Sequence, residues 1–73
     1  MDATRLVTLR TFSYEIDADI AKQHLESAGI PAFVRKDDIG GMQPAFQTQI
    51  GVFLEVREKD AKDAEQILKS RGI

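Results

Sequence analysis

The chain has 73 residues, of which 42% are hydrophobic and 30% are charged, and its formal net charge is −2. This composition is ordinary for one small soluble domain and argues against a disordered chain. The mild negative charge gives no general attraction to nucleic acid or to an anionic membrane. Without cysteine there is no disulfide, thiolate metal site or redox centre. We therefore expect a single cytoplasmic domain over residues 1–73, with no signal peptide and no membrane span.

The first two predicted elements are a strand over residues 5–12 and the helix that follows it. The segment RLVTLRTF is rich in β-branched residues and alternates, with Val7 and Leu9 on one face. The helix has one apolar stripe at helical spacing, which consists of Ala18, Ala21, Leu25 and Ala28. Gly29 is expected in the left-handed conformation just after the helix, and Pro31 prevents its continuation.

A second strand is predicted over residues 32–36, and a long connection, residues 37–50, follows it. A β-hairpin connection normally takes about 2–5 residues, whereas one of this length is often functional. The sequence DDIGGMQPAFQTQI has neither the alternating oxygen ligands of a calcium loop nor the Lys-Ser/Thr of a phosphate-binding loop. Its apolar Met42 and Phe46 and its glutamines suit recognition of a partner. The alternative is that this connection only covers the sheet.

The last two elements, a strand over residues 51–57 and a second helix, repeat the first pair. In the strand, Val52, Leu54 and Val56 alternate on one face. Segments 15–30 and 58–73 share nine identical residues at an offset of 43. Gly72 and Ile73 match Gly29 and Ile30, so the two helices are expected to end in the same way.

The element order β-α-β-β-α predicts an α+β fold, the ferredoxin-like (split βαβ) plait, with an antiparallel sheet and two helices on one face. A complete plait has a fourth strand, which we expect to be absent or supplied by a partner. Strand 5–12 then lies at an edge of the sheet, where unpaired backbone groups favour self-association.

The sheet face without helices is predicted to be unusually apolar and basic. By alternation it carries Leu6, Thr8, Arg10, Phe12, Phe33, Arg35, Phe53, Glu55 and Arg57. An exposed apolar surface rimmed by charge usually marks an interface. Residues 37–50 or a second copy of the chain are the simplest covers for it. An aromatic platform for RNA bases is a further alternative.

No group of residues resembles a catalytic site. His24 is the only histidine, and its neighbours in sequence offer no partner to orient it for acid–base work. The aspartates near the helix starts are interpreted as residues that stabilise the helix dipole. We expect no enzyme activity, no metal and no cofactor. An enzyme that combines His24 with Asp37 or Asp38 is the alternative.

The segments LVTLRTFSYEIDADIAKQHLESAGIPAFVRKDD and GVFLEVREKDAKDAEQIL resemble a family of small bacterial domains described as putative prokaryotic signal-transducing proteins. That family is similar to the PII nitrogen-signalling proteins, which share the ferredoxin-like plait. In PII proteins the long loop between strands 2 and 3 contacts partner proteins, and the resemblance gives residues 37–50 the same topological place. The PII nucleotide-binding residues have no match here, so the resemblance implies no ATP site.

These observations favour a regulatory, signal-transducing interaction module that recognises a protein partner or a second copy of itself. A homodimer would use the sheet edge or the open sheet face, and neither nucleic acid nor membrane is expected as a partner. A sensor of a small metabolite or nucleotide is the main alternative, and an RNA-binding sheet is the other. The candidate binding residues are Phe33, Arg35, Asp38, Met42, Gln43, Phe46, Phe53 and Arg57.

Overall fold

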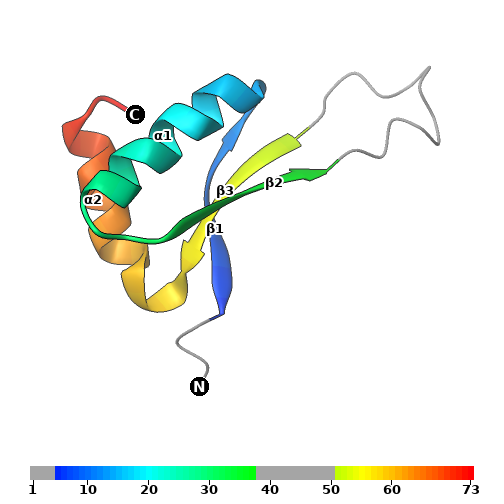
Figure 1. Cartoon of the computed structure of the whole chain (residues 1–73). Helices are drawn as coiled ribbons and strands as arrows, with labels where there is room; N and C mark the ends of the chain where they lie inside the picture. Colours follow the sequence, from blue (N-terminus) through cyan, green and yellow to red (C-terminus); the bar gives the residue numbers. More distant parts are fainter. Residues whose placement is uncertain (1–4, 38–50) are drawn as a thin grey trace, which may run out of the picture.

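The structure is a computed structural model, and it describes residues 5–37 and 51–73. Six elements follow one another along these residues (Figure 1): β1 (Leu6–Phe12), α1 (Glu15–Ser27), β2 (Ala32–Asp37), β3 (Gly51–Arg57), one turn of 3-10 helix η1 (Glu58–Asp60) and α2 (Ala61–Ser70). The predicted order β-α-β-β-α is confirmed. No helix among the described residues is both long and apolar enough to cross a bilayer.

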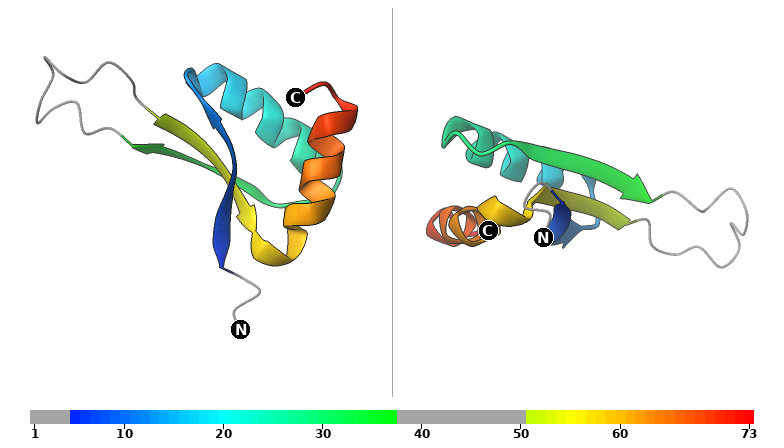
Figure 2. Two further views of the ribbon diagram at one scale, coloured as in Figure 1. Left: turned by 180° about the vertical axis from the view of Figure 1, so that it is seen from behind. Right: turned by 90° about the horizontal axis from the view of Figure 1, so that it is seen from below.

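The three strands form one antiparallel sheet in the order β1-β3-β2. Strand β3 is therefore central, and β1 and β2 are its neighbours on either side. Both helices pack on the same face of this sheet (Figure 2). The described part of the chain is thus a ferredoxin-like plait without its fourth strand, as predicted.

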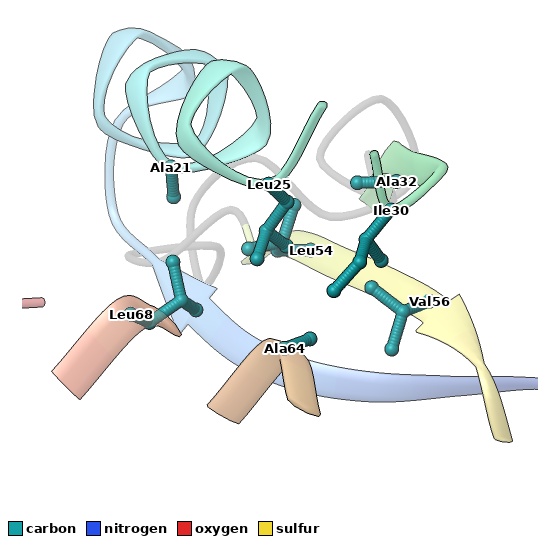
Figure 3. Close-up of a cluster of buried hydrophobic side chains, with 8 residues drawn as sticks. All are labelled: Ala21, Leu25, Ile30, Ala32, Leu54, Val56, Ala64 and Leu68. Carbon is teal, nitrogen blue, oxygen red and sulfur yellow. The ribbon is translucent and has the colours of Figure 1, made fainter. Parts of the chain in front are cut away.

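The hydrophobic core lies between the two helices and the central strand. Leu25 of α1, Leu68 of α2 and Leu54 of β3 are fully buried, and Figure 3 shows their side chains converging between the three elements. The predicted apolar stripe of α1 is confirmed at Ala18, Ala21 and Leu25, whereas Ala28 lies past the last turn and is exposed. Small alanines on both helices let the helix axes approach the sheet, so this short chain buries a continuous core.

Each helix ends in the predicted glycine motif. Gly29 and Gly72 have φ angles of 86° and 77°, in the left-handed region that side chains with a Cβ avoid. The N–H of Ile30 then donates to the carbonyl of Leu25 at 3.0 Å, and the N–H of Ile73 donates to that of Leu68 at 2.9 Å. These bonds satisfy carbonyl groups that the helix leaves open at its end, and they return both isoleucines to the core.

A β-bulge in β1 overturns part of the predicted face assignment. Thr8 pairs with Glu55 and Arg10 pairs with Leu54, so Leu9 is an extra residue without a partner in β3. One inserted residue reverses the alternation, because side chains along a strand point to opposite faces in turn. Arg10 and Phe12, predicted on the uncovered face, therefore lie on the helix side, and Thr11 takes the uncovered position.

The bulge has an electrostatic consequence. Arg10 reaches α2 and donates two hydrogen bonds to the carboxylate of Glu65, at 2.5 Å and 2.8 Å. The hydrogen bond and the positive charge of Arg10 lower the pKa of Glu65, and the same hydrogen bond raises the pKa of Arg10. A two-point pair of this kind fixes direction as well as distance, so it ties α2 to the edge strand β1.

The core predicts a large effect for truncation of Leu25. Leu25→Ala leaves a cavity between α1, α2 and β3, and we expect it to lower the free energy of unfolding by about 2–5 kcal/mol. Chemical denaturation measures this value. Gln23→Ala on the exposed side of the same helix is the control and should change it by less than about 0.5 kcal/mol. Equal effects of the two variants would contradict the assigned core.

The pair between Arg10 and Glu65 predicts a pH dependence of stability. Because the pKa of Glu65 is lower in the folded chain, its stabilisation is complete above the usual carboxyl pKa of about 4.3. That stabilisation is lost as the pH falls through the lower folded value. Glu65→Gln should therefore lower the free energy of unfolding at neutral pH. In acid, the free energies of unfolding of the variant and the wild type should become more similar. Denaturation at several pH values measures both.

Glu26→Gln is the matched control, since its carboxylate lies 3.9 Å from Lys22 in an exposed pair on α1. It should lose less stability at neutral pH than Glu65→Gln. If the free energy of unfolding of Glu65→Gln falls with decreasing pH as much as that of the wild type, the result argues against the ion pair.

Candidate functional site

The face of the sheet opposite the helices is the candidate site, and we call it the open sheet face. Strand register places two rows of side chains across it, Thr8–Glu55–Phe33 and Thr11–Phe53–Arg35, with Leu6 opposite Arg57 beyond the first row. The central strand supplies the middle of each row, because Phe53, Glu55 and Arg57 alternate with the buried Val52, Leu54 and Val56. The same alternation thus builds the core and the site.

Phe53 and Arg35 form a stacked pair on this face. The guanidinium carbon of Arg35 lies 4.5 Å from the centroid of the Phe53 ring, a cation–π distance. The ring also lies over Gly51, where an added Cβ would come within 2.6 Å of the Phe53 Cζ. Glycine at position 51 therefore makes room for the ring, and the ring in turn supports the arginine.

Glu55 is the most enclosed charged group of the open sheet face. Its carboxylate accepts hydrogen bonds from Arg35 at 3.1 Å and from the Thr8 hydroxyl at 3.3 Å. The Glu55 side chain is only 12% exposed, whereas that of Arg35 is 53% exposed. The face therefore carries a held carboxylate in its middle strand and an accessible cation on β2.

The apolar part of the face is Phe33 with Leu6 on the other edge strand. Phe33 is 45% exposed, and its neighbour across the strand pair is Glu55. Leu6 is exposed to a similar degree. Arg57 is half-buried and donates to Asp60 of η1 at 3.3 Å. The surface thus combines exposed apolar groups with charges whose positions are set by neighbours.

Four of the eight predicted binding residues lie on described strands, and the structure brings three of them together. Phe33, Arg35 and Phe53 are neighbours on β2 and β3, while Arg57 lies at the far end of β3 and turns to η1. Asp38, Met42, Gln43 and Phe46 lie outside the described residues. Their segment joins the end of β2 to the start of β3, and the pair Asp37–Gly51 closes the described part of that hairpin.

The structure separates His24 from Lys36, near the end of β2. Lys36, next to Asp37, pairs with Glu15 at the start of α1 at 3.2 Å. His24 is nine residues further along the helix, a displacement of about 13 Å. Its Nδ1 lies 3.1 Å from a guanidinium nitrogen of Arg71, at the end of α2. Among residues 5–37 and 51–73, no three acidic or histidine side chains are grouped so that they could hold a metal ion.

A groove lies on the helix side of the molecule, between the C-terminal end of α1 and the side of α2. It is open, with a volume of about 410 Å³, and its lining residues are Ala28, Ile30, Asp63, Gln66, Ile67 and Ser70. None of the predicted binding residues lines it. Among these lining residues Asp63 alone is charged, so they form no charge pair of the kind found on the open sheet face.

Fold and surface together define a small α+β domain of the ferredoxin-like plait with one helix-covered face and one open sheet face. Residues 6–72 match the model of the family described as "Putative prokaryotic signal transducing protein", DUF2007. The match covers nearly the whole chain, so the protein belongs to this family. It matches no curated protein and no solved structure.

Sequence reasoning missed three residues that take part in the site. Glu55 and Thr8 were predicted on the open sheet face but not as binding residues, although the alternation of β3 and a charged residue in its middle were available signals. Thr11 is absent from the predicted face, because simple alternation places Arg10 and Phe12 there and the bulge at Leu9 leaves no mark in the sequence.

The stacked pair predicts a measurable coupling. In a double-mutant cycle of Arg35→Ala and Phe53→Leu, we expect a coupling free energy of about 0.5–1 kcal/mol, the range for an exposed cation–π contact. Denaturant unfolding of the four proteins measures it. A control cycle of Lys69→Ala with Phe53→Leu should be additive, because Lys69 pairs with Glu65 on the other side of the sheet. A coupling of zero in the first cycle contradicts the stacking.

Proposed function

We propose that this protein is a non-enzymatic, signal-transducing interaction module whose open sheet face recognises a protein partner. The family description supports the signalling role. The observation that carries the mode of action is the arrangement of exposed Phe33 beside Arg35, with Arg35 held by Phe53 and Glu55. An apolar anchor next to a positioned arginine is the composition of binding hot spots in protein interfaces.

The preorganisation of Arg35 supports recognition rather than simple solubility. A free arginine on a surface loses side-chain entropy when a partner immobilises it. Here the Phe53 ring and the Glu55 carboxylate already restrict the guanidinium, so less entropy remains to be lost on binding. Its exposed half retains donors for a carboxylate or a carbonyl of the partner.

The same contacts favour a protein over RNA as the partner. Stacking of bases needs accessible aromatic faces, as in sheets that present two or three aromatic rings. Arg35 lies over the Phe53 ring, and Phe12 packs on the helix side. Phe33 is then the one strongly exposed phenylalanine of the described strands, and the net charge of −2 adds no attraction to phosphate.

Residues 37–50 extend the proposed surface along the chain. They connect the two strands that carry Phe33, Arg35 and Phe53, and their sequence supplies Met42, Gln43 and Phe46 as further contacts. The analogy with the loop between strands 2 and 3 of PII proteins supports this part of the proposal. A small-molecule sensor receives less support, because Arg35 and Arg57 bond to different carboxylates.

Affinity capture with defined variants tests the proposed function. Phe33→Ser and Arg35→Glu should each reduce recovery of the native partner from the cells of origin by about tenfold, since hot-spot residues contribute more than about 1 kcal/mol. Quantitative mass spectrometry of the bound proteins measures the change. Phe33→Ser should unfold at nearly the wild-type denaturant concentration, because its side chain is exposed. Arg35→Glu loses the contacts with Phe53 and Glu55 and should unfold at a lower concentration, so denaturation is used to confirm that it is fully folded under the capture conditions.

Lys62→Ala on the exposed side of α2 is the control and should leave capture unchanged. A partner that is recovered equally with the wild type, Phe33→Ser and Arg35→Glu does not use the open sheet face. That result would remove the proposed mode of recognition.

A further inference from the structure

The outer side of α1 carries two exposed isoleucines that the fold does not require. Ile16 is 67% exposed and Ile20 is 47% exposed, one helical turn apart. At 3.6 residues per turn they lie opposite the buried stripe of Ala18, Ala21 and Leu25. We call Ile16 and Ile20 the isoleucine pair. Neither belongs to the core that the described residues form.

The internal repeat shows that this position tolerates charge. At the offset of 43 residues, Ile16 and Ile20 match Lys59 and Asp63, which are exposed in η1 and α2. Both copies keep the alanines and the leucine that reach the core and the glycine that ends the helix. They differ on the outer side, where one copy is charged and the other is apolar. The isoleucine pair is therefore not explained by helix formation or by packing.

The open sheet face, in contrast, has exposed apolar residues and no helix of the described chain to cover them. Sheets of this kind bury their apolar faces against helices, and here both helices lie on the other side (Figure 2). A helix about 10 Å wide spans two neighbouring strands, which are about 4.8 Å apart. Laid across β3 and β2, the isoleucine pair of another molecule would contact Phe33 beside the stacked Arg35 and Phe53.

The most exposed charges beside these two surfaces are opposite in sign, because Glu55 on the open sheet face is only 12% exposed. Asp17 and Asp19 are placed on either side of the isoleucine pair by the helical period, and neither has an ion-pair partner among the described residues. Arg35 remains 53% exposed beside Phe33. An acidic rim around one apolar patch and an exposed arginine beside the other give attraction together with orientation.

From this complementarity we propose that the isoleucine pair of α1 docks on the open sheet face of a second copy of the chain. The proposal rests on the proposed function, since it names the partner of the same sheet surface. The two surfaces differ, so the contact is heterologous: each molecule offers a helix to one neighbour and a sheet to another. Such contacts close into rings or continue as filaments.

Complementation between two variants tests this arrangement. The helix variant carries Ile16→Lys and Ile20→Asp, the residue types found at Lys59 and Asp63 in the second repeat copy. The sheet variant carries Phe33→Ser and Arg35→Glu. Sedimentation equilibrium over a range of concentrations should show self-association of the wild type. Each variant alone should self-associate at least about tenfold more weakly.

The mixture provides the decisive measurement. The helix variant keeps the open sheet face, and the sheet variant keeps the isoleucine pair. An equimolar mixture should therefore form a one-to-one heterodimer that cannot grow further. Lys62→Ala should assemble like the wild type, and circular dichroism should show all variants folded. If the sheet variant unfolds, Arg35→Glu alone tests that surface while keeping both aromatic rings.

Three results would overturn the inference: a wild type that stays monomeric, a helix variant that assembles like the wild type, or a mixture that stays monomeric. The second result, combined with loss of assembly in the sheet variant, would exclude α1 as the ligand while retaining the open sheet face as the recognition surface. The proposed function fails separately, when partner capture is insensitive to Phe33→Ser and Arg35→Glu.

Discussion

The alternation of side chains along β3 is the constraint on which both sides of the molecule depend. Val52, Leu54 and Val56 point into the core, and the residues between them form the middle of the open sheet face. Because β3 is the central strand, both of its edges are hydrogen-bonded to neighbouring strands. The direction in which its side chains point is therefore fixed on both faces of the sheet at once. A change of register would therefore move the core and the proposed recognition surface together. This coupling explains how a chain of 73 residues can present a defined surface with so little interior.

The bulge in β1 modifies this plan at one edge. It brings Arg10 under α2, where the pair with Glu65 joins the edge strand to the helix layer. It also removes one arginine and one phenylalanine from the open sheet face and replaces them with Thr11. The candidate binding residues on the described strands are consequently concentrated on β2 and β3. A bulge further distorts the free edge of β1 and makes edge-to-edge pairing less favourable, which is a common device of edge strands. The bulge therefore favours the proposed docking of α1 on the open sheet face over pairing of β1 edges.

The internal repeat separates what each helix needs for folding from what it offers to a neighbour. Core alanines, the buried leucine and the terminal glycine are common to both copies, and these residues occupy equivalent places in the structure. The outer sides of α1 and α2 differ, and only α1 is apolar there. Comparison of α2 with α1 thus shows which residues of the repeat folding requires. The contrast is the reason to regard the isoleucine pair of α1 as a surface for binding.

Local physical rules in the sequence determined the elements, their order, the helix ends and the inward residues of β3. Each of these depends on neighbours within a few positions: alternation for strands, the helical period for stripes, and glycine for the left-handed turn. The family resemblance was likewise carried by the sequence and is confirmed. Tertiary structure alone decided the bulge at Leu9, the pair between Arg10 and Glu65, and the support of Arg35 by Phe53 and Glu55. These features join residues that are 18 to 55 positions apart, and their geometry follows from strand register and packing, which no local pattern records.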